Sequence, residues 1–137
     1  MTPDLSEEVI IEIPFHDVDL MGVAWHGHYV KYLEIARTAM MRKIGLDYAQ
    51  LKEGGYMWPV VECHLKYIKP LLYGMKVRVK ATLVECENRV KITYLMTDEA
   101  TGARLNKAWT TQVAVKGDTG ELEFTLPPHL FAAVLKP

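Results

Sequence analysis

The chain has few of the features that mark a special cellular environment. It contains only two cysteines, Cys63 and Cys86, and neither lies in a CxxC or Cys/His spacing. Because two cysteines cannot form the disulfide framework of a small secreted protein, we expect both to be free thiols in a reducing compartment. No run approaches the roughly 18 apolar residues that span a bilayer. The N-terminus MTPDLSEEV lacks the basic and apolar parts of a signal peptide. We therefore expect a cytoplasmic protein without a membrane span.

A surplus of one charge sign is also missing. The 137 residues include 16 Lys or Arg and 17 Asp or Glu, which gives a net charge of −1. Proteins that bind nucleic acids usually carry a basic surplus, so we expect no nucleic-acid partner. Half of the residues are apolar, which is enough for a core, and the sequence has no repeats or linkers. We predict one domain over residues 1–137.

One long helix is predicted by apolar periodicity. The segment HYVKYLEIARTAMMRKIG has apolar residues at spacings of three and four. These residues are Val30, Leu33, Ala36, Met40 and Ile44. The spacing predicts a helix over about residues 28–44 that ends at Gly45. A short turn or helix is expected over 47–55, and a terminal helix over 127–135.

Strands are predicted on both sides of this helix. A β-branched run precedes it, and four alternating runs follow it. The predicted strands cover residues 8–13, 57–69, 75–86, 89–99 and 104–117. Short turns join the last four, so neighbouring strands are antiparallel. The fold class is α+β, a five-stranded antiparallel sheet with one long helix. One helix covers only part of such a sheet, so we expect a homo-oligomer, either a dimer or a tetramer.

The strand over 57–69 carries a specific prediction about its two faces. Its residues alternate between apolar and polar, as in a strand with one buried face. The apolar side consists of Val61, Cys63, Leu65 and Tyr67. We expect these four side chains to face the core.

Titratable residues concentrate in residues 15–29, FHDVDLMGVAWHGHY. No Ser, Thr, Asp or Asn stands at the predicted helix start, so its first N–H groups lack a capping side chain. Free N–H groups at a helix N-terminus suit an oxyanion, and Gly22 and Gly27 leave room for a ligand near the backbone. Asp19 precedes His26 by seven residues. A carboxylate beside such N–H groups makes a minimal acyl-transfer site. A polar loop without chemistry fits the same residues.

A metal site is the third interpretation of this stretch, and the spacing disfavours it. His26 and His28 are two residues apart, whereas side chains on one helix face are three or four apart. No HExxH or Cys/His pattern is present. We therefore assign no metal.

The same residues resemble a known family. The pattern D-x-D-x-x-G-V-x-W-H-x-x-Y before the helix, and Y-x-x-P further on, is similar to that of hot-dog-fold acyl-CoA thioesterases of the 4-hydroxybenzoyl-CoA thioesterase and YbgC types. The residues that carry it are Asp17, Asp19, Gly22, Val23, Trp25, His26, Tyr29, Glu34, Ala36, Arg37, Tyr67 and Pro70. The resemblance covers about residues 8–117. It implies a sheet wrapped around a central helix, dimers with fused sheets, and hydrolysis of a coenzyme A thioester.

The resemblance also implies roles for residues in this stretch. Asp19 falls on the catalytic carboxylate. His26 falls on the backbone N–H that binds the oxyanion, and its ring is a second possible participant. Tyr29 falls on a tyrosine that lines or orders the site. Asp17 falls on an aspartate that we interpret as structural.

The remaining assignments concern the substrate. We place Gly22, Trp25 and Gly27 against the substrate. Arg89 and Lys91 are candidates for its phosphates, since coenzyme A is anionic. Coenzyme A is part of the substrate, so no cofactor is predicted. His16 and His28 are expected to be loop histidines without a role.

Two other functions fit the resemblance. The chain could bind acyl-CoA or acyl-carrier protein without hydrolysis, or it could be a hot-dog dehydratase or isomerase acting on an acyl thioester. Thiol release separates hydrolysis from both. The sequence does not specify the acyl group.

Overall fold

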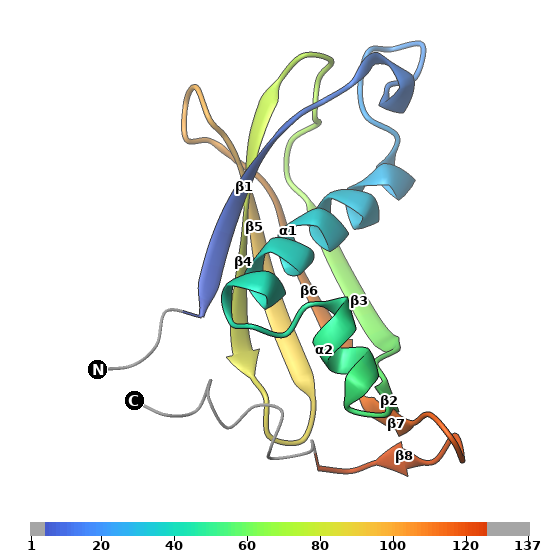
Figure 1. Cartoon of the computed structure of the whole chain (residues 1–137). Helices are drawn as coiled ribbons and strands as arrows, with labels where there is room; N and C mark the ends of the chain where they lie inside the picture. Colours follow the sequence, from blue (N-terminus) through green and yellow to red (C-terminus); the bar gives the residue numbers. More distant parts are fainter. Residues whose placement is uncertain (1–4, 126–137) are drawn as a thin grey trace.

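A long helix lies against one face of an antiparallel sheet (Figure 1). The computed structural model describes residues 5–125. The helix is α1, Tyr29–Lys43. The sheet has the order β1-β4-β5-β6-β3. Its strands are β1 Ser6–Glu12, β3 Val60–Tyr67, β4 Lys76–Glu85, β5 Val90–Asp98 and β6 Arg104–Gln112. All pairs are antiparallel, which confirms the predicted α+β architecture.

Two predicted strands are interrupted. The run over 57–69 divides into β2, Tyr56–Met57, and β3, because Pro59 has no N–H to donate to a ladder. The run over 104–117 divides into β6 and β7, Ala114–Lys116. A second sheet with the order β2-β7-β8 includes β8, Leu122–Glu123. The short helix predicted over 47–55 is α2, Tyr48–Glu53.

The core lies between α1 and the inner face of the sheet. The buried residues of α1 are Tyr29, Tyr32, Leu33, Ala36, Met40 and Met41. They pack with apolar side chains of β4 and β5, among them Val77, Val79, Ile92 and Met96. Each large apolar side chain that is fully buried stabilises the fold by about 1.5–3 kcal/mol. Val30, one of the residues of the apolar spacing, is 40% exposed, and Tyr29 takes the core position beside it.

Strand β3 differs most from its prediction. Val61, Cys63 and Tyr67 are exposed, and only Leu65 is partly buried. The cause is the position of α1, which packs mainly on β1 and β4 and leaves the inner face of β3 uncovered. In this chain β3 is also an edge of the sheet, with one side unpaired. An apolar edge strand of this kind can pair with another chain.

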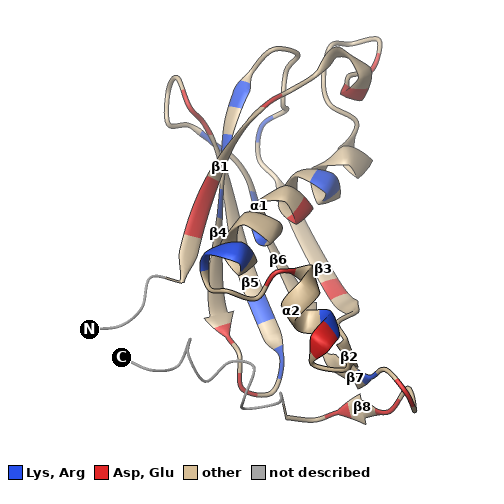
Figure 2. Ribbon diagram, in the orientation of Figure 1, with Lys and Arg blue, Asp and Glu red and all other residues tan. Residues whose placement is uncertain are grey.

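Charged side chains of both signs occur on the sheet and on the helices (Figure 2). None of the helices within residues 5–125 is long and apolar enough to span a membrane. The terminal helix predicted over 127–135 lies outside the described residues.

Candidate active site

The polar stretch folds into a tight loop that leads directly to α1. The loop doubles back on itself: the N–H of Trp25 donates to the carbonyl of Asp17 at 3.1 Å, and the N–H of Asp19 donates to that of Val23 at 2.9 Å. Gly22 turns the chain with a φ of 77°, a conformation that favours glycine. The backbone conformation therefore explains this glycine, for which the sequence suggested ligand approach.

Asp19 is exposed at the turn of this loop. One oxygen of its carboxylate, Oδ1, accepts the N–H of Met21 at 2.8 Å and that of Val23 at 3.4 Å. This is the usual way in which an aspartate closes a turn. Within residues 5–125, Oδ2 has no hydrogen-bond partner. The carboxylate thus retains one oxygen that can act on a ligand.

The helix starts without a side-chain cap, as the sequence predicts. A 3-10 turn, His26–His28, runs into α1 without a break, because His28 has helical φ and ψ of −76° and −17°. Neither Trp25 nor His28 caps the N–H groups. Among the described residues, the N–H groups of His26 and Gly27 donate to no acceptor. Two free N–H groups at the positive end of a helix dipole suit a developing negative charge.

Gly27 has a packing role that the sequence did not reveal. A Cβ atom at this position would lie 2.2 Å from the ring of Trp25. The indole therefore occupies the space that a side chain would need. Trp25 itself is 54% exposed, so its other face is open to a ligand.

Two tyrosines, one at the first position of α1 and one at the end of β3, hold the helix start in place. Tyr29 is buried, and its hydroxyl accepts the N–H of Leu71 at 3.3 Å. Burial raises the pKa of Tyr29, so the phenol stays neutral. The Tyr67 ring meets that of Tyr29 edge to face at 4.8 Å, and its hydroxyl donates to the carbonyl of His26 at 3.0 Å. The first turn of α1 is thereby attached to the end of β3.

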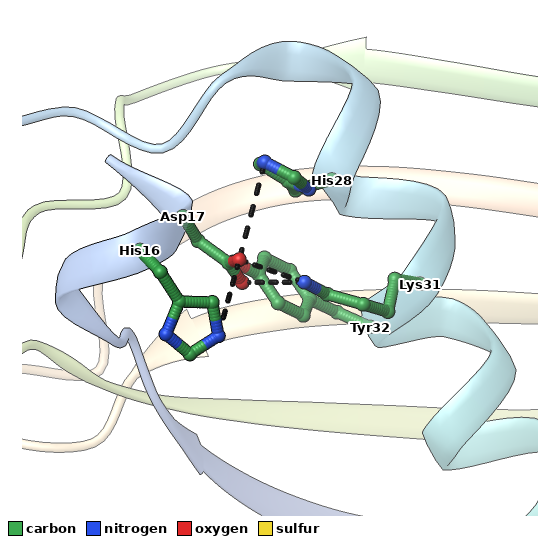
Figure 3. Close-up of polar contacts among 5 residues, drawn as sticks. All are labelled: His16, Asp17, His28, Lys31 and Tyr32. Atoms are coloured by element: carbon green, nitrogen blue, oxygen red, sulfur yellow. Dashed lines mark hydrogen bonds and ion pairs between the residues drawn. The ribbon is translucent and has the colours of Figure 1, made fainter. Parts of the chain in front are cut away.

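Asp17 lies behind this loop as the centre of a buried polar cluster (Figure 3). Its side chain is 1% exposed. The Lys31 ammonium lies 2.8 and 2.7 Å from its two oxygens, and the Tyr32 hydroxyl donates at 2.6 Å. Burial alone would raise the pKa of Asp17, but the hydrogen bonds from Lys31 and Tyr32 and the charge of Lys31 hold it below its ordinary value. This position fits the structural interpretation of Asp17.

The two flanking histidines also face Asp17. Nε2 of His16 lies 3.7 Å and Nε2 of His28 lies 3.9 Å from Asp17 Oδ1, from opposite sides (Figure 3). The His16 side chain is 79% exposed, whereas that of His28 is 32% exposed. The sequence suggested that His28 is an exposed loop residue, but the structure shows that it is only partly exposed and faces Asp17. No set of three or more metal-ligating side chains occurs within residues 5–125.

Arg89 and Lys91 lie far from this loop in the same chain. Arg89 binds Glu85 at 2.8 Å in the hairpin between β4 and β5, at the end of the sheet opposite the start of α1 (Figure 1). Lys91 lies 4.9 Å from the ring centre of Trp109. One chain therefore does not bring them to Asp19 and His26.

Sequence reasoning missed three side chains that organise the site. Lys31 and Tyr32 hold Asp17, and Tyr67 holds His26. A signal for Tyr67 was present, since it is the tyrosine of the Y-x-x-P pattern. Lys31 had a weaker signal, as a cation in the first turn of a helix, where a cation is unfavourable unless a carboxylate faces it.

Comparisons with known proteins point to one family. Residues 13–134 match the family model of the thioesterase-like superfamily. The Bacillus subtilis protein YneP, whose assignment as an acyl-CoA thioesterase is itself provisional, is 34% identical over 84 residues, which are 61% of this chain and 60% of YneP. A Synechocystis protein, provisionally an esterase, is 31% identical over 94% of this chain and 78% of its own length. The DHNA-CoA thioesterase of Staphylococcus aureus superposes with a TM-score of 0.78 at 29% identity, over 85% of this chain and 78% of that one.

Proposed function

Because this chain belongs to the thioesterase-like superfamily, we propose that it hydrolyses the thioester of an acyl-coenzyme A to a free acid and coenzyme A. The observation that carries the proposal is an exposed carboxylate, Asp19, on the loop that delivers two free N–H groups at the start of α1. Such a pair supplies a nucleophile or base and an oxyanion site, which are the two requirements of acyl transfer.

The proposed reaction uses few groups. The thioester carbonyl oxygen binds at the N–H of His26, and Asp19 attacks the carbonyl carbon or takes a proton from a water that does so. The carbon–sulfur bond breaks, and the sulfur leaves with its electron pair as a thiolate, which takes up a proton from solvent. In the covalent route, water then cleaves the acyl–Asp19 anhydride. A thiolate is a good leaving group, so no strong general acid is needed. Heavy-oxygen water under single turnover labels Asp19 only in the covalent route.

A panel of aromatic, short-chain and long-chain acyl-CoAs tests the function by thiol release. We expect at least one to be hydrolysed with kcat in the ordinary enzyme range of about 1–10³ s⁻¹. Binding of several acyl-CoAs without thiol release would favour a non-hydrolytic binding module. Loss of an enoyl absorbance without free thiol would favour a dehydratase or isomerase.

The active form in this proposal is a dimer or a higher oligomer. Large apolar side chains are exposed on the polar loop and on β3 and the segment that follows it. They are Phe15, Leu20, Met21, Trp25, Val60, Val61, Tyr67, Ile68, Leu72 and Tyr73. Apolar exposure of this extent is typical of an interaction site. A second copy that pairs its β3 antiparallel to the first would cover it.

Such pairing also completes the ligand site. A cavity of about 650 Å³ lies beside the C-terminal half of α1 and α2, with Met41, Leu51, Tyr56 and Trp58 among its lining residues. In one chain this cavity lies beside the C-terminal half of α1, whereas His26 precedes the N-terminal end of that helix. A two-fold axis through β3 reverses the direction of α1 and brings the cavity of one copy towards the helix start of the other. The proposed contacts of Arg89 and Lys91 with substrate phosphates need the same second copy.

Val61→Lys is expected to convert the oligomer to monomers and to abolish turnover. Val61 is 53% exposed on β3, so a lysine there leaves the fold of one chain intact but places a charge in the paired edge. Light scattering after gel filtration and thiol release measure the two effects. Val84→Lys is the matched control, because Val84 is a valine of β4 with 52% exposure. Oligomers of full size and activity in Val61→Lys would contradict pairing through β3.

The proposal includes a cytoplasmic location. Cys63 and Cys86 are both free thiols, which fits a reducing compartment.

A further inference from the structure

The carbonyl of His26 has an unusual set of partners for a helix start. It accepts the N–H of Tyr29, as the 3-10 turn requires, and also the hydroxyl of Tyr67 at 3.0 Å. The second bond comes from β3, 41 residues away in the sequence. The turn could close without it, so the Tyr67 hydroxyl does something in addition to forming the turn.

This carbonyl belongs to the same peptide group as the N–H of Gly27. A hydrogen bond to the oxygen of a peptide draws electron density from its nitrogen and makes its N–H a stronger donor, because bonds in a chain polarise one another. The bond also fixes the plane of the peptide, and hence the direction of the N–H. The Gly27 N–H has no acceptor among the described residues. Tyr67 therefore acts on a donor that is free to bind a ligand.

We propose that Tyr67 is a positioning residue that orients and polarises the His26–Gly27 peptide, and that the Gly27 N–H is a second oxyanion donor beside that of His26. The inference rests on the proposed thioester hydrolysis and extends it. The oxyanion contacts two N–H groups of adjacent residues. The hydrogen bond from Tyr67 of β3 orients only one of them, the N–H of Gly27.

The surroundings of Tyr67 suit this role. Its ring lies between the rings of Tyr29, at 4.8 Å, and His26, at 6.4 Å, both edge to face. This packing fixes the ring, while the residue is 46% exposed in one chain. Burial raises the pKa of Tyr67, so its hydroxyl keeps the proton that it donates at neutral pH. The absence of a side chain at Gly27 lets Trp25 pack over the same peptide.

Tyr67→Phe tests the inference, because it removes the hydroxyl and keeps the ring against Tyr29. One neutral hydrogen bond corresponds to about a fivefold to tenfold effect, so we expect kcat to fall by about this factor. The KM should change less than twofold, because the donor acts most strongly on the negative charge of the transition state. The melting temperature should stay that of the wild type. Tyr94→Phe is the matched control, since it removes a tyrosine hydroxyl that is hydrogen-bonded to Thr110 at 2.8 Å on β5, outside the loop and the helix start.

A second measurement does not depend on turnover. In a ¹⁵N-labelled protein, loss of the bond to the His26 carbonyl should move the Gly27 amide nitrogen resonance upfield in Tyr67→Phe and leave it in place in Tyr94→Phe. If no acyl-CoA is hydrolysed by the wild type, the proposed function fails, and this shift still reports on the peptide. An unchanged Gly27 resonance, wild-type kcat in Tyr67→Phe, or a loss of melting temperature with equal effects on kcat and KM would each overturn the positioning role.

Discussion

Asp19→Asn is expected to lower kcat by about 10³-fold while the protein stays fully folded. Removing a positioned base or nucleophile costs about two to four orders of magnitude in rate. The fold should be unaffected, because Asp19 is exposed and, within residues 5–125, its side chain is hydrogen-bonded only by the N–H groups of Met21 and Val23, which donate to Oδ1. An asparagine oxygen can accept both bonds. Thiol release from the best acyl-CoA and the melting temperature are the two measurements.

Asp98→Asn is the matched control for this change. Asp98 Oδ1 accepts the N–H of Ala100 at 3.0 Å, which is the same kind of turn contact as that of Asp19, in the hairpin between β5 and β6. We expect wild-type turnover and stability from Asp98→Asn. Wild-type turnover in Asp19→Asn would remove this residue from the mechanism. Equal losses in the two variants would assign the effect to the turns rather than to chemistry.

Much of the fold could be predicted because local patterns determine it. The apolar spacing of Leu33, Ala36 and Met40 gave a helix over 28–44, and the structure has α1 over Tyr29–Lys43. The alternation in β4 and β5 gave strands that match to within one residue at each end. Burial in β3 could not be predicted in this way. The alternation of an edge strand is the same whether its apolar face meets a helix of its own chain or a second chain.

The same distinction between local patterns and long-range contacts applies to the residues of the site. The uncapped helix start and the carboxylate of Asp19 are close in sequence, so pattern and resemblance suffice to indicate them. Tyr67 reaches His26 across 41 positions, and Lys31 reaches Asp17 across 14. Such contacts depend on how β3 and α1 lie against the loop, and no periodicity encodes this.

The Asp17 cluster connects the loop that carries Asp19 to α1 and allows a test of stability as a function of pH. Asp17 comes from the loop, and Lys31 and Tyr32 come from the first turn of the helix. In the wild type the pKa of Asp17 is below its ordinary value of 3.8. The ion pair therefore contributes stability at pH values above about 4 to 5, and this contribution is lost as pH falls through the lower pKa of the folded state. Between pH 7 and 5 this contribution should be constant.

Lys31→Met should reverse the sign of this pH dependence. Without the ammonium, Tyr32 is the one hydrogen-bond donor to Asp17 that remains within residues 5–125, and burial, the largest influence on this carboxyl, should raise its pKa above the ordinary value. At pH 7 the variant should lose about 2 kcal/mol, which is below the usual 3–5 kcal/mol for a buried pair because the Lys31 side chain is 47% exposed. As pH falls from 7 to 5, a proton on Asp17 neutralises the uncompensated charge. The variant should then regain stability, while the wild type stays constant.

Urea unfolding at pH 7, 6 and 5 measures this convergence. Arg42→Met is the matched control, because Arg42 and Asp47 form an exposed ion pair with a 2.9 Å contact. Water already solvates both partners of that pair, so its loss should have little effect and none that changes between pH 7 and 5. The difference in unfolding free energy between the wild type and Lys31→Met could also stay the same at all three pH values. That result would show that burial does not raise the pKa of Asp17 in the variant. If the difference closes, the loop that carries Asp19 is held to α1 by the charge of Lys31 on Asp17. A single proton on Asp17 can then compensate for the loss of the Lys31 charge.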